Sequence, residues 1–178
     1  CTARSSAMEP EQLFTLLNRY FEVMSAPVLA EQGLLDKFIG DSVMAEFGVP
    51  QHRGDQEEAL AAVRASLAMQ RNLHQLNKEL ADEGQEPLRH GIGIHCGDVV
   101  AGNLGSSQRL EYTVIGGSVN VASRRETLTR LLPEHAILIS REVLDLLGEK
   151  VRVESLGSHS VKGWPEPIEV FSLRDLIA

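Results

Sequence analysis

The sequence predicts an α+β fold: a ferredoxin-like βαββαβ core sheet with helices on one face and a C-terminal β-hairpin extension. Two observations support this prediction. Segments with helical and strand-like periodicity follow one another in the order α β β α β β β α β α β β. Adjacent strands with helices to one side favour an α+β sandwich over a doubly wound parallel sheet. The βαββαβ order also includes a strand before the first helix. That strand is missing here, so we expect residues 1–178 to be a single domain truncated at its N-terminus.

The predicted helices are four segments with apolar residues at helical spacing, residues 10–33, 55–84, 118–132 and 141–148. Pro10 is typical of a first helical turn, and Gly33 is typical of a residue that ends a helix. The second helix begins near Asp55, where Asp55 and Glu58 form a D-x-x-E pattern that resembles a cap.

The predicted strands fall between these helices, in residues 34–39, 42–49, 88–106, 111–116, 136–140 and 151–173. Gly40 and Asp41 join the first two strands. Within residues 88–106 we expect two short strands followed by a glycine-rich loop, and the last segment should form two strands around a turn that holds Lys162. The glycine-rich stretch lacks both nucleotide-loop fingerprints, so its glycines indicate tight turns and close strand packing.

The composition excludes several classes of function. The net charge of −8, with mixed charges and 4% aromatic residues, argues against a nucleic-acid groove. No run approaches the roughly 18 apolar residues of a membrane span, and no signal peptide is apparent, so we expect no direct membrane contact. Cys1 and Cys96 build neither a disulfide framework nor a zinc site, which is typical of a cytoplasmic protein.

Lys37 and Asp41 are the first candidate site residues. A Gly-Asp turn is common for reasons of turn geometry alone. A carboxylate at a sheet end can instead hold Mg²⁺, which prefers one or two carboxylates together with substrate phosphates. Lys37 lies between apolar residues in a predicted strand, which suggests a fixed position for its ammonium group.

Asn120 and Arg124 form the second candidate pair. They lie four residues apart, so on a helix they share one face. A guanidinium and an amide that project together can hold a phosphoryl group and a sugar oxygen. The same spacing is common in surface pairs, and Thr113 in the preceding strand also suits a purely structural role.

Four separated segments, taken together, resemble the catalytic domain of class III adenylyl cyclases. They are LDKFIGDSVMAEFG, GIGIHCGDVVAGNLGS, YTVIGGSVNVASR and SVKGWPEPIEVFSL. The resemblance covers about residues 1–174 and is most similar to the bacterial type in which this domain is the output of upstream sensory domains.

The resemblance implies roles for individual residues. Lys37 and Thr113 match the pair that selects adenine, where guanylyl cyclases place an acidic residue and a cysteine. Asn120 matches the residue that orients the ribose, and Arg124 matches the one that stabilises the transition state. Lys162 matches a lysine that meets the triphosphate.

The resemblance also implies two metal ions, Mg²⁺ or Mn²⁺, at each site. Asp41 matches the second metal-binding aspartate, and Thr2 matches a residue near the β- and γ-phosphates. The first metal aspartate would lie a few residues upstream of Cys1, so either the parent protein supplies it or the domain lacks half of its metal site. Because the other motif residues are present, we favour the former.

The expected function is therefore conversion of ATP to 3′,5′-cyclic AMP and pyrophosphate by a homodimer with two interface sites. The resemblance implies that Asp41 of one protomer faces Lys37, Thr113, Asn120 and Arg124 of the other. Bicarbonate is the expected small activator. The alternatives are a catalytically silent cyclase-like regulatory module and a guanylyl cyclase.

Overall fold

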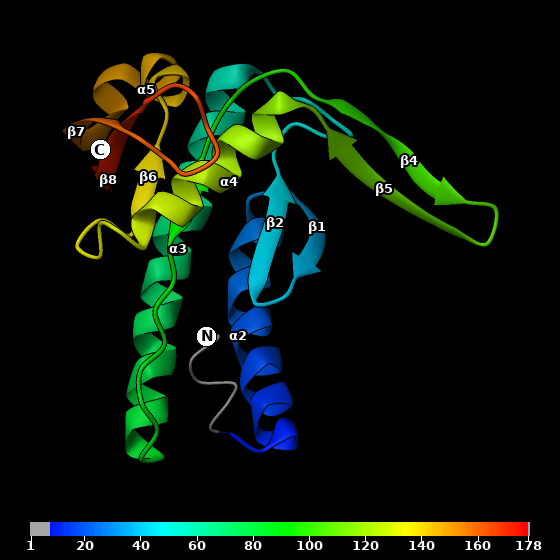
Figure 1. Ribbon diagram of the computed structural model, residues 1–178, viewed down its shortest axis with the longest axis vertical. Helices are drawn as coiled ribbons and strands as arrows, with labels where there is room; N and C mark the ends of the chain where they lie inside the picture. Colours follow the sequence, from blue (N-terminus) through cyan, green and yellow to red (C-terminus); the bar gives the residue numbers. More distant parts are fainter. Residues whose placement is uncertain (1–7, 178) are drawn as a thin grey trace.

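The computed structural model describes residues 8–177. Its helices are α2 (Pro10–Ala30), α3 (Asp55–Asp82), α4 (Gly117–Thr129) and α5 (Arg141–Leu147), followed by a short 3-10 turn, η1 (Gly148–Lys150). Its strands are β1 (Leu34–Ile39), β2 (Ser42–Glu46), β3 (Ile92–Ile94), β4 (Val100–Ser106), β5 (Arg109–Ile115), β6 (Ile137–Ile139), β7 (Val151–His159) and β8 (Ile168–Leu176). This order confirms the predicted succession of elements and the α+β class (Figure 1).

The strands form three sheets. β1 and β2 make an antiparallel hairpin, and β4 and β5 make a second one that projects from the body of the molecule (Figure 1). The largest sheet has the order β3-β6-β8-β7 and contains the predicted C-terminal hairpin, β7–β8. β3 and β6 are parallel, since the chain between them crosses over through α4.

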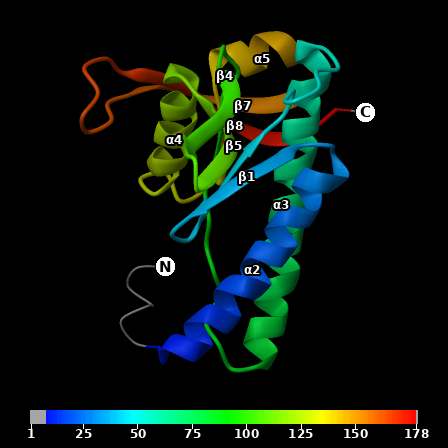
Figure 2. The same ribbon diagram turned by 90° about the vertical axis from the view of Figure 1, so that its right-hand side faces the viewer.

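Helices cover both faces of the four-stranded sheet, whereas the sequence predicted helices on one face. On one face, apolar side chains of α3 and α5 pack against alternate residues of the strands, including Ile137, Ile139 and Phe171. On the opposite face, Leu128 of α4 packs against Leu138 and its neighbours on β8. α2 and α3, the helices of the expected βαββαβ motif, lie together as a long pair, as the two views agree (Figures 1 and 2).

Two local expectations differ from the structure. The N-cap of α3 is Gly54, at φ +108°, and it makes no side-chain cap. Glu58 instead accepts hydrogen bonds from the backbone and side chain of Arg53. The expected glycine-rich loop is part of strand β4, because β5 supplies a hydrogen-bonding partner for it as far as Ser106. Within residues 8–177, no helix is both long and apolar enough to cross a bilayer.

Candidate active site

The hairpin β1–β2 holds Lys37 and Asp41. Gly40 adopts φ +61°, the positive value that a two-residue type II′ turn requires at its first central position. Asp41 therefore lies exposed at the tip of the hairpin. Lys37 lies nearer the base, opposite Met44 of β2.

A bulge in β1 turns Asp36 inward. Leu35 pairs with Ala45 and Lys37 pairs with Met44, so Asp36 has no partner in the ladder between them. Such a bulge bends the strand and redirects a side chain. The side chain of Asp36 is only 1% exposed.

Asp36 contacts both members of the predicted base-reading pair. The Thr113 hydroxyl donates a hydrogen bond to Oδ2 of Asp36 at 2.6 Å. Nζ of Lys37 lies 3.5 Å from Oδ1 of the same carboxylate. The structure thus brings Lys37 and Thr113 together through one buried carboxylate.

The protonation states of this cluster differ from residue to residue. Burial alone would raise the pKa of Asp36, but the hydrogen bond from Thr113, the nearby Glu46 carboxyl and the charge of Lys37 leave it lowered. Burial, and then the neighbouring Asp36 carboxyl, raise the pKa of Glu46 to about 8. At neutral pH, Asp36 is therefore ionised and Glu46 carries a proton.

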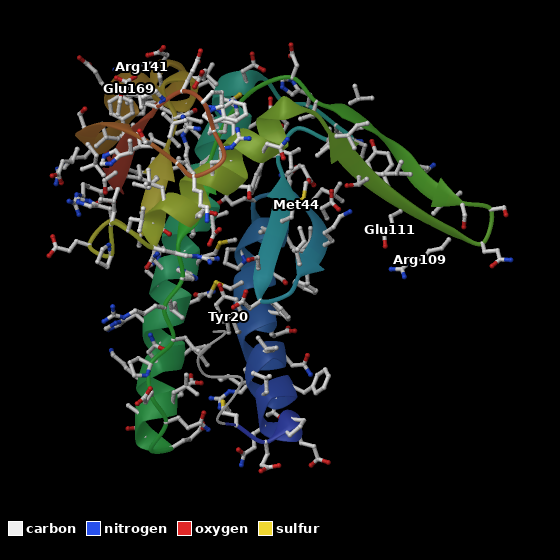
Figure 3. All side chains as sticks on the ribbon, in the orientation of Figure 1. Tyr20, Met44, Arg109, Glu111, Arg141 and Glu169 are labelled. Carbon is white, nitrogen blue, oxygen red and sulfur yellow. The ribbon has the colours of Figure 1, made fainter. Side chains whose placement is uncertain are left out.

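A second carboxylate reaches Lys37 from the outer hairpin. Oε2 of Glu111, on β5, lies 3.5 Å from Nζ of Lys37. Glu111 is also paired with Arg109 at 2.7 Å, and both side chains lie on the projecting part of β5 (Figure 3). The Lys37 ammonium is therefore held between a buried and an exposed carboxylate.

Helix α4 carries Asn120 and Arg124, and it packs very closely on β3. A Cβ atom at Gly93 would lie 2.3 Å from the carbonyl oxygen of Ala122. Only glycine permits this approach, in agreement with the predicted close packing of the glycine-rich segment. Asn120 is exposed, and Arg124 is half-buried on the same side of the helix.

Arg124 lies under the turn between β7 and β8. Its guanidinium carbon is 3.3 Å from the centroid of the Trp164 ring. Nη1 of Arg124 is buried and has no hydrogen-bond partner within residues 8–177. Lys162 is exposed in the same turn, two residues before Trp164. The predicted phosphate-binding residues Arg124 and Lys162 thus belong to neighbouring elements.

Sequence reasoning missed Asp36, Glu46 and Trp164. A signal for Asp36 was present, since an acidic residue interrupts an otherwise apolar strand directly before Lys37. Nothing in the local pattern of residues marks Trp164 as the partner of Arg124. Thr2 lies outside the described residues.

Asp41 is chemically suited to a hard cation, because Mg²⁺ prefers carboxylate oxygens and needs only one or two of them beside phosphate oxygens. In the described part of the chain, His, Cys, Asp and Glu side chains form no group of three that could hold a metal ion. Asp41 fits one ligand position of the expected metal site, with substrate phosphates as further ligands.

Residues 1–175 match the family of the adenylate and guanylate cyclase catalytic domain. The chain belongs to this family. Its relatives include Adenylate cyclase 1 of Rhizobium meliloti, which is 32% identical over 97% of this chain. An adenylate cyclase of Anabaena cylindrica is 36% identical over 97% of this chain. The chain spans 25% and 34% of the length of these two relatives.

Two solved structures are very similar to this cyclase domain. The adenylyl cyclase CyaB from P. aeruginosa has a TM-score of 0.87 and 35% identity, over 98% of this chain and 88% of that one. The guanylyl cyclase Cya2 also has a TM-score of 0.87, with 32% identity, over 98% of this chain and 86% of that one. Since the two differ in the nucleotide that their names imply, the choice of nucleotide depends on individual side chains.

Proposed function

We propose that this domain is an adenylyl cyclase that converts ATP to 3′,5′-cyclic AMP and pyrophosphate. The observation that supports this most directly is the cluster of Lys37 and Thr113 around Asp36. Lys37 offers a hydrogen-bond donor to a ring nitrogen of adenine, and Thr113 offers its hydroxyl oxygen to the amino group. An acidic residue and a cysteine, expected at these positions in a guanylyl cyclase, are absent from them.

In the proposed reaction, the ribose 3′-oxygen attacks the α-phosphorus of the same ATP molecule. A new P–O bond closes the ring, the bond from the α-phosphorus to the oxygen that bridges it to the β-phosphate breaks, pyrophosphate leaves with the electron pair, and the 3′-hydroxyl proton passes to solvent. The reaction depends mainly on positioning and on charge neutralisation. Asn120 orients the ribose, and Arg124 stabilises the negative charge that develops on the α-phosphoryl oxygens. Lys162, and Thr2 near the β- and γ-phosphates, hold the triphosphate.

Asp41 is the proposed metal ligand of this chain. Two Mg²⁺ or Mn²⁺ ions, when bound, supply activation of the 3′-hydroxyl and neutralisation of the triphosphate. The chain spans 25% and 34% of the length of its two adenylate cyclase relatives, so the natural protein that contains the domain is the one to assay.

A homodimer is proposed because apolar side chains stand exposed next to the base-reading cluster. Phe38 and Ile39 are exposed at the end of β1. The hairpin β4–β5 and the residue before it expose Val99, Val100, Leu104, Leu110, Tyr112 and Ile115. Contiguous exposed apolar surface is typical of protein interfaces. In a symmetric dimer, the same surface would be covered on both protomers, and the interface would contain two equivalent sites.

The deciding experiment measures cyclic AMP and cyclic GMP formed by the natural protein from ATP and GTP, with Mg²⁺ or Mn²⁺. We expect cyclic AMP as the main product. A preference for GTP would instead make the protein a guanylyl cyclase. Formation of neither product, with all upstream residues present, would favour a catalytically silent regulatory module.

Bicarbonate is the proposed small activator, and upstream sensory domains are the proposed source of regulation. The same assay, with and without added bicarbonate at constant pH, tests the first of these proposals. A rate that does not change with bicarbonate would contradict it and leave the cyclase assignment intact.

A further inference from the structure

We propose that Asp36 is a specificity-determining positioning residue, which makes the Thr113 hydroxyl an obligate acceptor and thereby favours a purine with an amino group at position 6. This inference rests on the proposed cyclase function and assigns a role to a residue that does not itself contact the base.

The geometry of β1 shows that Asp36 is placed for its contacts across the hairpin. Its bulged position, between the pairs Leu35–Ala45 and Lys37–Met44, removes it from the regular alternation of the strand. The bulge buries a carboxylate that a regular strand position next to Lys37 would direct elsewhere. A buried carboxylate is costly unless its oxygens are paired. Here Thr113 and Lys37 pair with them.

The hydrogen bond fixes the direction in which the Thr113 hydroxyl can act. A hydroxyl has one hydrogen to donate and lone pairs that accept. At 2.6 Å, the Thr113 hydrogen is committed to Oδ2 of Asp36, and an ionised carboxylate can only accept. Thr113 is itself buried, so only a ligand group that reaches its oxygen directly can meet it, and such a group encounters lone pairs only.

This direction distinguishes the two purines. Adenine carries an amino donor at position 6, whereas guanine carries an acceptor oxygen there. The amino group can donate to the Thr113 oxygen. The oxygen of guanine would face another set of lone pairs, with no hydrogen between them. A threonine with a freely rotating hydroxyl would accept either base, so the discrimination at this position comes from Asp36.

Asp36 also restrains Lys37, the other residue of the pair. Nζ of Lys37 lies 3.5 Å from Oδ1 of Asp36 and 3.5 Å from Oε2 of Glu111. One carboxylate therefore sets both the direction of the Thr113 hydroxyl and the position of the ammonium group. A loss of binding through Lys37 would affect every purine whose ring nitrogen accepts a hydrogen bond, whatever group stands at position 6. A purine without a group at position 6 therefore separates the effect on Lys37 from the effect on Thr113.

The test compares kcat/KM for ATP and GTP in the natural protein and in its Asp36→Asn variant. An asparagine of the same shape can donate as well as accept, which frees the Thr113 hydroxyl to turn. We expect the ratio of kcat/KM for ATP to that for GTP to fall roughly threefold to tenfold, the size of one hydrogen bond. Purine riboside triphosphate, which has only hydrogen at position 6, measures the part of any loss that does not involve that position. We expect the loss for ATP to exceed the loss for this analogue.

Two further variants separate positioning from general damage. Asp82→Asn, an exposed aspartate at the end of α3, should leave the ratio unchanged. The double variant Asp36→Asn with Thr113→Val should discriminate no less than Thr113→Val alone, because Asp36 acts through the hydroxyl. If Asp36→Asn does not fold, Asp36→Ser replaces it, since serine also both donates and accepts.

The proposal is overturned if the variant loses activity toward ATP, GTP and the analogue by one common factor, or if the effects of Asp36 and Thr113 on the ratio are additive. Competition of ATP and GTP for binding measures the preference for the two bases in the ground state, without catalysis. If the wild type forms neither cyclic nucleotide, the proposed function fails, while the binding ratio still decides for or against Asp36. A wild type that binds neither nucleotide overturns both proposals.

Discussion

The guanidinium of Arg124 stacks on the ring of Trp164, with 3.3 Å between the guanidinium carbon and the ring centroid. A planar guanidinium over an indole is an attractive arrangement, which contributes about 0.5–2 kcal/mol depending on how dry the site is. The stacking leaves one edge of Arg124 buried without a hydrogen-bond partner in residues 8–177. The unused donors of this residue are thus held in place beside the turn that carries Lys162.

Replacing Arg124 by lysine should reduce kcat while changing KM for ATP very little. Lysine keeps the charge but loses the planar fork and the stacking on Trp164. If Arg124 acts on charge that develops only in the transition state, kcat should fall by roughly 10²–10³. Steady-state kinetics of cyclic AMP formation measure both constants. The exposed Arg130, the residue directly after α4, provides the control Arg130→Lys, and an equal loss there would refute a special role for Arg124.

Binding of ATP should change the fluorescence of Trp164. The chain contains one tryptophan, so its emission within this domain reports on this contact alone. When the guanidinium moves toward a phosphate, the cation leaves the face of the ring and the surroundings of the indole change. We expect a saturable change in the emission of Trp164, taken as the difference between the natural protein and its Trp164→Phe variant, with a non-cyclisable ATP analogue and Mg²⁺. In the Arg124→Ala variant, most of this change should disappear. An equal response in both proteins would show that Arg124 does not move on binding.

Glu46 should make the protein less stable as the pH rises. In the folded state its pKa is raised from 4.5 to about 8, so the folded protein holds a proton that the unfolded chain has already released. The stabilisation is complete below pH 4.5 and is lost as the pH rises through about 8. Between pH 4.5 and about 8 the free energy of unfolding should fall by up to about 1.4 kcal/mol per pH unit, less to the extent that water reaches the carboxyl.

The measurement for Glu46 is urea denaturation of the wild type and of Glu46→Gln, an uncharged substitute of the same shape. Comparison above pH 6.5 excludes His90, whose pKa burial lowers from 6.5 to about 4, so that it titrates only at lower pH. The profile of Glu46→Gln should be flatter than that of the wild type. Parallel profiles would show that Glu46 does not retain its proton in the folded protein.

The succession of elements could be predicted from the sequence because it is a local property. Helical spacing and turn residues such as Gly40 act over a few residues, and the structure confirms what they predict. The glycine-rich segment was predicted less well. The glycine-rich end of residues 88–106 reads as a loop by composition, but β5 supplies the partner strand that makes it extended. Pairing between strands depends on the partner, which the segment itself does not reveal.

The candidate site shows the same limit. Lys37, Thr113 and Arg124 could be found because they belong to motifs of the cyclase family. The groups that hold these three side chains could not be found in this way. The role of Asp36 could be predicted only with knowledge of the bulge in β1, and that bulge depends on how β1 and β2 are aligned. Trp164 meets Arg124 only because the turn between β7 and β8 folds back over α4. Residues that position a site come together through tertiary packing, so they follow from the fold and not from the spacing of the motifs.

Two inactive chains should restore activity when mixed, if each site is shared between protomers. Asp41→Ala removes the metal ligand from one wall of the proposed site, and Arg124→Ala removes the guanidinium from the other wall. In a mixed dimer, one site combines both defects and the second site has neither. Random pairing of equal amounts should therefore recover about a quarter of the wild-type sites.

The matched control for this mixture is Lys37→Ala with Arg124→Ala. Both residues are proposed to lie on the same wall, so every site of their mixed dimer would contain one defect. We therefore expect no recovery of cyclic AMP formation from the control pair. Equal recovery of cyclic AMP formation in both mixtures would contradict the proposed division of these residues between the two walls. No recovery in the Asp41→Ala and Arg124→Ala mixture, despite dimers seen by light scattering, would place the whole site within one chain.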